Sequence, residues 1–313
     1  MTLKPRLAFV AFDYQLERMT AFLRYLPECE VVAFDLRNNG FERDIIAYGP
    51  DAIIQYGTET TDEPRVKLNQ RYAIAQAIAP TFYAENAWLP QRDYLYVDAI
   101  GLAEQSDFAE SSLKSQVDTM DTDALDEALE HYRRVSAGSG SFERGEFVLG
   151  CLQIPDDTVI RRASPVQDMQ VFINELERHL RHVPLVIRPH PLDPRSYTAS
   201  TASLRSDGRI GDWIRRARAV VACNSTTLLE SVAWGTPAIA LGRGVYSGKS
   251  VCAELNGDWG LLPSALKFTP DEDEARRFLW DALIRQVPIL PGSPDLTEWN
   301  PVIPLITELL TCA

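Results

Sequence analysis

The stretch LVIRPHPLDP, residues 185–194, decides how this chain is interpreted. Its apolar start, Leu185–Ile187, predicts a buried strand, and that strand runs directly into Arg188–Pro191. Proline fixes φ at its own position and favours extended backbone at the residue before it, so His190 is expected outside any helix. In open α/β sheets, ligands bind beyond the carboxyl ends of the strands. The stretch therefore predicts that a cation, Arg188, and an imidazole, His190, lie on a stiff loop at that edge.

A single histidine in a loop is more often structural than functional. Two further polar turns make a functional role for His190 more plausible. The turn Gln153–Thr158 (QIPDDT) follows a predicted strand at Phe147–Leu152. The turn Asn224–Thr227 (NSTT) follows another at Ala219–Cys223. Because the carboxyl ends of parallel strands lie at one edge of a sheet, we expect the three turns to meet over a single cleft.

Segments typical of strands and helices alternate through the chain. In the first half we expect strands at residues 7–12, 30–35, 51–56 and 81–85, helices at 16–26 and 66–78, and an irregular aromatic stretch at 86–101. In the second half we expect strands at residues 147–152, 185–187, 219–223 and 237–241, and helices at 169–180, 210–216, 225–234, 271–286 and 302–310. This alternation predicts an α/β protein with parallel sheets covered by helices.

One segment, Ser136–Ser141 (SAGSGS), is small, polar and typical of a linker. The sequence therefore predicts two Rossmann-like domains, at residues 1–140 and 141–290, with a terminal crossing segment and helix at 291–313. The acidic stretch Asp118–Glu130, just before the linker, is most simply a solvated amphipathic helix.

The composition limits the classes of function. The chain has 313 residues, 45% of them hydrophobic, as expected of a packed globular protein. Its formal net charge of -13 argues against nucleic acid as a partner, because binding to phosphates needs clustered Lys and Arg. Five scattered cysteines lack the spacing of metal ligands, and no apolar run reaches 18 residues. We therefore expect a cytoplasmic protein with reduced cysteines, no leader and no membrane span, which is compatible with peripheral association with the inner membrane.

The turn Asn224–Thr227 carries the elements of a phosphate site. Ser225 and Thr226 stand where a predicted helix begins, and free backbone N–H groups and the helix dipole at such a position favour an anion. Plain capping of the helix is an equally good explanation. Glu230, one turn later and followed by Gly-Thr-Pro at residues 235–237, is placed to accept hydrogen bonds from ribose hydroxyls.

Three carboxylates are candidates for chemistry. Asp156 and Asp157 are adjacent on the turn after Leu152, and either could face the ligand, although a solvated acidic turn is the default explanation. Glu85 ends the strand predicted at residues 81–85, where a surface charge or a helix cap is the simpler reading. A carboxylate near a glycosidic carbon can act as nucleophile or base, while a histidine or arginine stabilises a departing phosphate. The combination is suited to glycosyl transfer.

Three strings together resemble the capsular polysaccharide synthesis family, which includes the retaining β-Kdo transferases that use CMP-Kdo. The strings are LGCLQIPDDTVI (149–160), LVIRPHP (185–191) and NSTTLLESVAWGTPAIALGRGVY (224–246), and the resemblance extends over residues 81–246. It implies the two-domain GT-B architecture, with an acceptor-side domain first, a nucleotide-sugar donor domain second, and a C-terminal helix that crosses back. It also implies that transfer needs no metal.

The resemblance also implies roles for individual residues. Asp157 is the implied catalytic nucleophile, His190 the implied contact to the CMP phosphate, and Glu85 the implied acidic residue of the acceptor-side domain. Ser225 and Thr226 are implied to line the phosphate pocket. Family members often carry an acidic-Gly pair where this chain has Glu-Asn-Ala at residues 85–87.

The sequence thus predicts a transferase that moves Kdo or a similar acidic sugar from a CMP-linked donor to a surface glycan or a lipid-linked acceptor. The expected nucleotide-binding residues are Gln153, Arg188, Ser225, Thr226 and Glu230. Two other hypotheses fit the same motifs. One is a different GT-B enzyme, such as a UDP-sugar transferase or a nucleotide-sugar epimerase. The other is a glycan-binding protein without catalytic activity.

Overall fold

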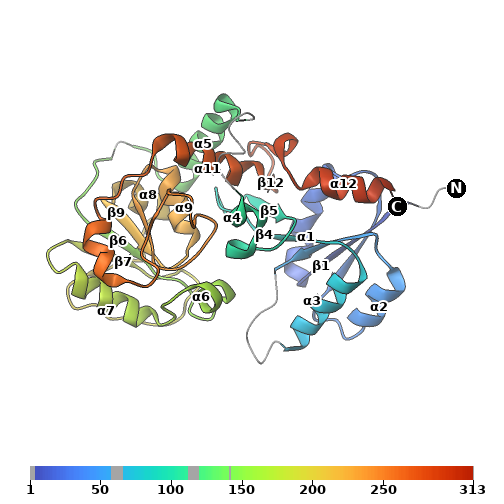
Figure 1. Ribbon diagram of the computed structural model, residues 1–313, viewed down its shortest axis with the longest axis horizontal. Helices are drawn as coiled ribbons and strands as arrows, with labels where there is room; N and C mark the ends of the chain where they lie inside the picture. The colour runs from blue at the N-terminus through green and yellow to red at the C-terminus, as the bar shows by residue number, and fades with distance from the viewer. Residues whose placement is uncertain (1–3, 58–65, 112–119, 141, 313) are drawn as a thin grey trace. The chain divides into compact units, whose positions relative to one another are not determined.

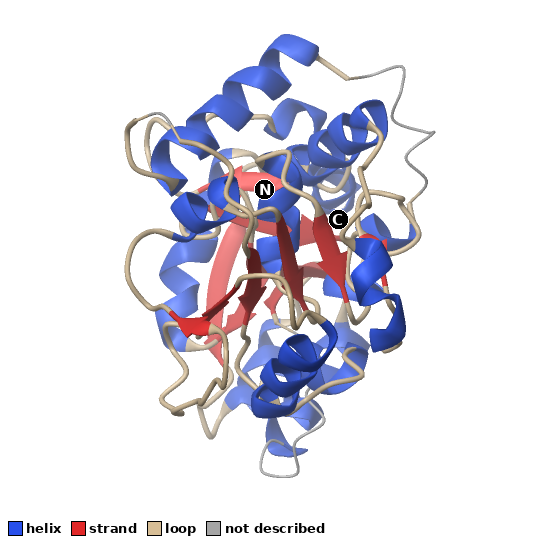
Figure 2. Cartoon of the chain, turned by 90° about the vertical axis from the view of Figure 1, so that its left-hand side faces the viewer, coloured by secondary structure: helices blue, strands red, loops and turns tan. Residues whose placement is uncertain are grey.

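The computed structural model describes residues 4–57, 66–111, 120–140 and 142–312. Its contacts divide the chain into two compact units, and we describe each by itself. The first unit contains residues 1–110 and 282–313, and the second contains residues 111–281. In both units helices lie on either side of the strands (Figure 1 and Figure 2).

The first unit is built on a six-stranded sheet in the order β12-β5-β4-β3-β1-β2. Four of its strands are parallel: β1 (Arg6–Ala11), β2 (Glu30–Asp35), β3 (Ala52–Tyr56) and β4 (Thr81–Asn86). Its helical segments are α1 (Asp13–Met19), η1 (Thr20–Arg24), α2 (Phe41–Tyr48), α3 (Val66–Ile78), η3 (Ala103–Gln105), α4 (Asp107–Glu110), η6 (Thr297–Trp299) and α12 (Ile303–Cys312). The parallel strands, α3, and the segment formed by α1 and η1 lie within a few residues of the predicted elements, whereas no bounds were predicted for α2.

Alternate residues of the central strands face two separate cores. Leu7 and Phe9 of β1 pack with residues of η1 and α12, including Phe22 and Ile306. Ala8 and Val10 point the other way and pack with residues of α2 and α3. A strand with both faces buried reads as a continuous apolar run, which is why LAFVAF was recognisable in the sequence.

Two antiparallel strands complete this sheet. β5 (Tyr94–Asp98) pairs with β4, and β12 (Gln286–Pro288) pairs with β5. The sequence interpretation of residues 86–101 as wholly irregular is therefore wrong, since all five residues of β5 are buried in the sheet. β12 has three residues and lies far along the chain from β5, so no local pattern identified the pair.

The second unit is built on a parallel six-stranded sheet in the order β11-β10-β9-β6-β7-β8. The strands are β6 (Val148–Cys151), β7 (Leu185–Arg188), β8 (Ser203–Leu204), β9 (Ala219–Ala222), β10 (Ala238–Ala240) and β11 (Ala253–Glu254). The helical segments are α5 (Thr122–Ser136), α6 (Thr158–Ala163), α7 (Met169–His179), α8 (Ile210–Arg216), α9 (Thr226–Ala233), η5 (Trp259–Leu261), α10 (Leu262–Ala265) and α11 (Glu272–Ile284), whose last residues belong to the first unit.

The core of the second unit lies between the sheet and α6, α7 and α10. Ile187 and Val221 on the strands pack with Phe172 and Leu176 on α7. Gly150 of β6 permits this close approach, because a Cβ there would lie 2.7 Å from Leu176 Cδ1. α9 packs against β9 and β10, and α8 packs against α9.

The units divide differently from the domains expected around residues 136–141. The contacts place the division between Glu110 and Ser111, because α5 packs against α8 and uses Arg133 to bond the carbonyl of Ala233 at the end of α9. α5 begins at Thr122, and residues 118, 119 and 141 of the expected segments lie outside the described residues. The terminal helix α12 joins the first unit, as expected of a chain that crosses back.

Candidate active site

The turns after β6 and β9 are joined at the carboxyl edge of the second sheet. Gln153 Nε2 donates to Asn224 Oδ1 at 2.9 Å, and the Asn224 backbone N–H donates to Gln153 Oε1 at 3.0 Å. Asn224 Nδ2 also donates to the carbonyl of Val159 in α6 at 2.9 Å. β6 and β9 are the strands between which the sheet order reverses, and such a switch point is where open α/β sheets bind ligands. The predicted meeting of these two turns is therefore present in the fold.

The adjacent aspartates of the first turn have different environments. Asp156 is held by two arginines: Arg161 donates to its Oδ1 at 2.7 Å, and Arg195 donates to its Oδ2. Asp157 is exposed and caps α6, where its Oδ1 accepts from the Val159 backbone N–H at 2.9 Å. Oδ2 of Asp157 makes no hydrogen bond within the described part of the chain. Asp157 is thus the aspartate with an oxygen available to a ligand.

His190 lies half-buried on the loop after β7. Its Nδ1 accepts from the Leu192 backbone N–H at 3.2 Å, so the ring proton of the neutral form is assigned to Nε2. Burial lowers the pKa of His190, while the carboxylates of Asp157 and Asp193 act in the opposite direction. The geometry therefore presents His190 as a neutral donor through Nε2, whereas a cation would lose the bond from Leu192.

Arg188, the last residue of β7, uses its guanidinium to hold the segment that follows β8. It donates to the carbonyl of Asp207 at 2.7 Å and to that of Gly208 at 2.7 Å. This side chain ties the neighbouring loop to the sheet edge and keeps a positive charge there.

The start of α9 has the geometry of an anion site. Ser225 is the N-cap residue, and its hydroxyl accepts from the Thr227 backbone N–H at 3.2 Å. Thr226 is the first residue of the helix. The free N–H groups at such a start, together with the helix dipole, attract negative charge. The structure thus shows the cap that the sequence predicted, at the same sheet edge as Asp157 and His190.

Glu230 lies one turn along α9. Burial raises the pKa of its carboxyl to about 7, and the hydrogen bond from the Tyr132 hydroxyl to Oε2, at 2.8 Å, acts in the opposite direction. Tyr132 belongs to α5 and is fully buried, so its hydroxyl is fixed. One carboxylate oxygen of Glu230 is therefore engaged inside the unit.

Glu85 belongs to the first unit, and its surroundings within that unit are as follows. It lies on β4 directly opposite Tyr96 of β5, in a partly buried position. Its charge contributes to the raised pKa values of the Tyr56 and Tyr96 hydroxyls, for which burial is the larger cause. The fold thus places Glu85 at the carboxyl end of a parallel strand, as the sequence predicted.

Three site contacts were missed by sequence reasoning. Tyr132 lies two residues beyond the segment predicted as a solvated helix, Asp118–Glu130, and it is the partner of Glu230. Arg161 and Arg195, which hold Asp156, carried no signal beyond their charge. The contacts Tyr132–Glu230 and Arg195–Asp156 join segments 98 and 39 residues apart, which no local pattern relates.

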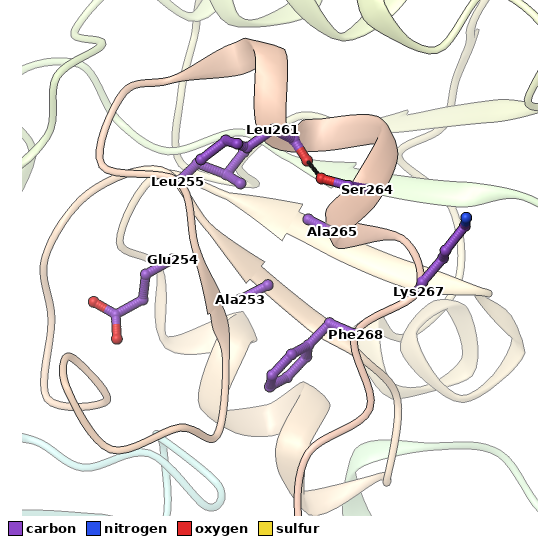
Figure 3. Close-up of a pocket in the computed structure, with 8 residues that line it drawn as sticks. All are labelled: Ala253, Glu254, Leu255, Leu261, Ser264, Ala265, Lys267 and Phe268. Carbon is purple, nitrogen blue, oxygen red and sulfur yellow. Dashed lines mark hydrogen bonds between the residues drawn. The ribbon is translucent and has the colours of Figure 1, made fainter.

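Pockets formed by described residues of the second unit include the following two. One, of about 360 Å³, has Glu254 and Lys267 on opposite sides (Figure 3) and is lined by Ala253, Glu254, Leu255, Leu261, Ser264, Ala265, Lys267 and Phe268. The other, of about 550 Å³, is lined by residues that include Asp207, Gly208 and Trp213. The second pocket adjoins the site, because Arg188 holds the carbonyls of Asp207 and Gly208.

Two properties of the described ranges bear on cofactors and location. They contain no group of three or more His, Cys, Asp or Glu side chains arranged to hold a metal ion. Every helix in them is too short or too polar to cross a lipid bilayer.

Comparison with known proteins gives a family match. The family model described as "Capsule polysaccharide biosynthesis protein" matches residues 54–259, more than half of the chain. Protein FixF of Sinorhizobium fredii (strain NBRC 101917 / NGR234) is 31% identical over 146 residues, which are 42% of this chain and 36% of that protein. The aligned part thus spans little more than a third of the curated relative.

Two solved structures share the architecture. The β-Kdo 2,7 transferase of Thermosulfurimonas dismutans KpsC superposes with a TM-score of 0.62 at 15% sequence identity, over 99% of both chains. The β-Kdo 2,4 transferase of the same protein superposes with a TM-score of 0.56 at 16% identity, again over 99% of both chains. At this level of identity the likeness concerns the fold, and it confirms the predicted two-unit GT-B architecture.

Proposed function

The chain belongs to the capsule polysaccharide biosynthesis protein family, and from this premise we propose that it is a glycosyltransferase of the Kdo transferase type. The donor is a CMP-activated Kdo or a similar acidic sugar, and the acceptor is a surface glycan or a lipid-linked glycan. The observation that carries the proposal is the Gln153–Asn224 pair, which joins the turn bearing Asp157 to the helix start at Ser225. A carboxylate and an anion-binding helix start at one sheet edge are what transfer from a sugar phosphate requires.

The nucleotide would be held by residues of the second unit. Its phosphate would bind the N–H groups at Ser225 and Thr226, with the Arg188 charge at the end of β7, two strands along the sheet from β9. Glu230 would accept from a ribose hydroxyl through Oε1, since Tyr132 already occupies Oε2. Gln153 supports this site indirectly, because its amide is bonded to Asn224.

The first step would be attack by Asp157. Its Oδ2 forms a bond to the anomeric carbon, the bond from that carbon to the phosphate oxygen breaks, and the electron pair leaves with CMP. His190 donates a hydrogen bond from Nε2 to the departing phosphate. The neutral imidazole is suited to this role, because Nδ1 remains bonded to the Leu192 N–H throughout.

The second step would transfer the sugar to the acceptor. An acceptor hydroxyl oxygen forms a bond to the anomeric carbon, the bond to Asp157 breaks, and the hydroxyl proton passes to a general base. Two displacements at one carbon retain the stereochemistry of the donor. No step of this proposal uses a metal ion. We place the transfer reaction in the cytoplasm, where the CMP-sugar and the acceptor would meet at the membrane face.

The test has two parts. Thermal unfolding with CMP, UDP or GDP should show stabilisation by CMP, since a ligand at 100 times its Kd adds about 2.7 kcal/mol. Mass spectrometry after incubation with CMP-Kdo should show a Kdo adduct that fragmentation places on Asp157, and the Asp156→Asn variant should form it as well. Stabilisation by UDP alone would exclude a CMP donor. An adduct on Asp156, or none during active turnover, would exclude Asp157 as the nucleophile.

A further inference from the structure

A chain of charged contacts joins the loop of His190 to the turn of Asp157. Arg195 donates to Asp156 Oδ2 on the turn after β6, and its other guanidinium nitrogen donates to Asp193 Oδ1 at 3.0 Å. Asp193 belongs to the loop after β7, where its backbone N–H donates to the carbonyl of His190 at 3.0 Å. One arginine thus bridges the carboxylate beside Asp157 and the carboxylate three residues after His190.

The His190 end of this bridge is fixed by a buried carboxylate. The side chain of Asp193 is 0% exposed. It accepts from the Tyr197 hydroxyl and from the Arg195 backbone N–H at 3.2 Å, in addition to the guanidinium. These contacts outweigh the effect of burial and lower the pKa of Asp193. The loop therefore has a charged centre that fixes the position of Arg195.

The Asp157 end is fixed by a second arginine. Asp156 is 54% exposed at its side chain, and Arg161 of α6 holds its other oxygen. Exposed ion pairs of this kind contribute about 0 to 1 kcal/mol to stability. The two ion pairs of Asp156 contribute little to folding, yet they occupy both of its oxygens, so their effect on the orientation of the turn is the better explanation for them.

We propose that Arg195 and Asp193 are positioning residues, which hold the imidazole of His190 and the carboxylate of Asp157 at a fixed separation. The proposal rests on the proposed function for its catalytic consequence, though not for its geometry. Asp157 and Asp193 both act electrostatically on the His190 ring. Loss of the bridge would leave each loop folded and free to shift relative to the other.

The experiment compares Arg195→Gln, Arg195→Lys and Asp193→Asn with the wild-type protein. Arg195→Gln should lower kcat about 10- to 100-fold, the effect expected of a displacement near 1 Å, with the donor KM unchanged within twofold. Arg195→Lys, which keeps the charge and reaches a single carboxylate, should restore part of kcat. The matched control is Arg178→Gln, which removes an exposed ion pair with Glu175 inside α7 and should leave kcat unchanged.

A second measurement is independent of transfer activity. The pKa of His190, followed by NMR, should fall in Asp157→Asn, because the nearby negative charge is removed. In an Arg195→Gln background the same Asp157→Asn change should have a smaller effect, since the two loops are no longer held together. This double-mutant cycle measures the coupling that the bridge maintains.

The outcomes separate the two claims. Full activity of Arg195→Gln, or an equal effect of Asp157→Asn on the His190 pKa in both backgrounds, would overturn the positioning role. A protein that transfers no sugar from a CMP donor, yet shows the reduced coupling, would overturn the proposed function and leave the bridge intact. If Arg195→Gln does not fold, the effect of Asp157→Asn on the His190 pKa can be measured in the Arg195→Lys and Asp193→Asn backgrounds instead.

Discussion

Gln153 and Asn224 exchange two hydrogen bonds across the switch point of the second sheet, one between their side chains and one from the Asn224 backbone N–H. Gln153→Ala would leave that nearly buried N–H without its acceptor. We expect a loss of about 1 to 3 kcal/mol in the free energy of unfolding, the cost of a buried polar group left unpaired. We also expect CMP to bind at least about tenfold more weakly, because the turn before Ser225 loses its support, a change worth about 1.4 kcal/mol.

Urea unfolding and calorimetric titration with CMP would measure both effects. The control is Asn174→Ala, which removes an exposed amide from α7 and should change neither quantity by more than about 0.5 kcal/mol. Unchanged CMP affinity in a folded Gln153→Ala protein would contradict the link between the two turns.

The two functions of Asp157 can be separated by the choice of substitution. Alanine removes both the cap of α6 and the nucleophile, so Asp157→Ala should lose transfer and about 1 kcal/mol of stability. Asparagine is an equally good cap, so Asp157→Asn should lose transfer while unfolding at the wild-type urea concentration. A urea titration alongside a CMP-Kdo transfer assay distinguishes the two.

Asp168 offers a matched control, because it caps α7 in the same way and accepts from the Gln170 N–H at 2.7 Å. Asp168→Ala should lose a similar amount of stability and retain transfer. Turnover by Asp157→Asn at the wild-type rate would exclude this residue from the chemistry.

Much of the fold could be predicted because local patterns specify it. The strand Glu30–Asp35 and the helix Val66–Ile78 were predicted with the bounds that the structure shows. The strand is an apolar run, and the helix ends two residues before Pro80, a residue that interrupts helices. β5 was missed because a short antiparallel strand lacks the long apolar run of a buried parallel strand, and because one of its partners, β12, lies far along the chain.

The site was predictable to the level of the sheet edge and no further. The turns of Asp157, His190 and Ser225 could be located because strands of alternating α/β segments end at one edge. Side-chain partners could not, because Tyr132 reaches Glu230 from 98 residues away and Arg195 reaches Asp156 from 39. A sequence does not show which tertiary partner a charged loop side chain will have, so such a side chain is read as solvated.

Glu230 should make the stability of the protein depend on pH. Burial raises its pKa to about 7 in the folded state, so the folded protein keeps a proton that the unfolded chain releases near its ordinary value of 4.5. Stability should therefore fall as the pH rises from about 4.5 to 7 and stay level above that. Glu230→Gln cannot titrate, so relative to wild type it should gain up to about 3 kcal/mol between pH 5 and pH 8.

Urea unfolding of both proteins at pH 5 and pH 8 would measure this difference. Glu127→Gln, an exposed change on α5, is the control and should track the wild type at both pH values. Tyr132→Phe removes the hydrogen bond that opposes the effect of burial and should increase the pH dependence. Parallel curves for wild type and Glu230→Gln would show that the Glu230 carboxyl titrates at its ordinary pKa.

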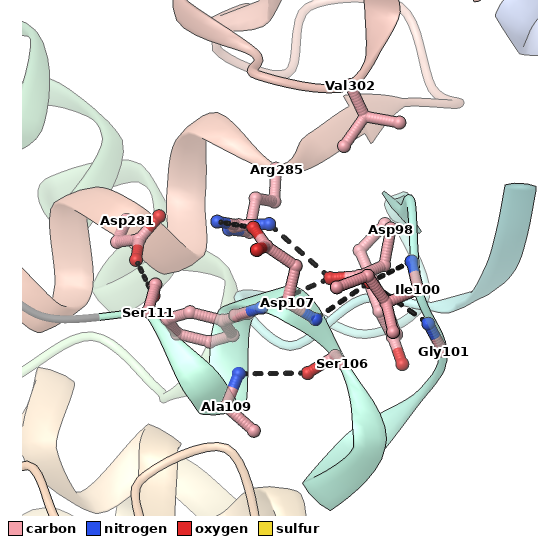
Figure 4. A network of polar contacts seen from close by, with 12 residues as sticks. Asp98, Ile100, Gly101, Ser106, Asp107, Ala109, Ser111, Asp281, Arg285 and Val302 are labelled. Atoms are coloured by element: carbon pink, nitrogen blue, oxygen red, sulfur yellow. Dashed lines mark hydrogen bonds and ion pairs between the residues drawn. The ribbon is translucent and has the colours of Figure 1, made fainter. Parts of the chain in front are cut away.

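Asp98 and Arg285 form a buried ion pair in the first unit whose two members should differ in importance (Figure 4). Asp98 is 0% exposed and accepts from the backbone N–H groups of four residues, Ile100, Gly101, Asp107 and Phe108, at 2.9 to 3.2 Å. Arg285 also donates to Asp107 Oδ2 at 2.9 Å. Four N–H donors stabilise the charge of Asp98 even without the guanidinium.

Removing one member of a buried pair costs about 3 to 5 kcal/mol in general. The cost of Arg285→Met should lie near the lower end of this range, about 3 kcal/mol, because the backbone N–H groups still donate to Asp98. Asp98→Asn should cost more, since an amide NH2 would face backbone N–H groups and the Arg285 charge would lose a partner. Arg276→Ala breaks a pair with Asp126 whose side chains are 29% and 60% exposed, and it should cost less than about 1 kcal/mol. Urea unfolding ranks the three variants, and equal costs for Asp98→Asn and Arg285→Met would show that the backbone donors do not carry the charge.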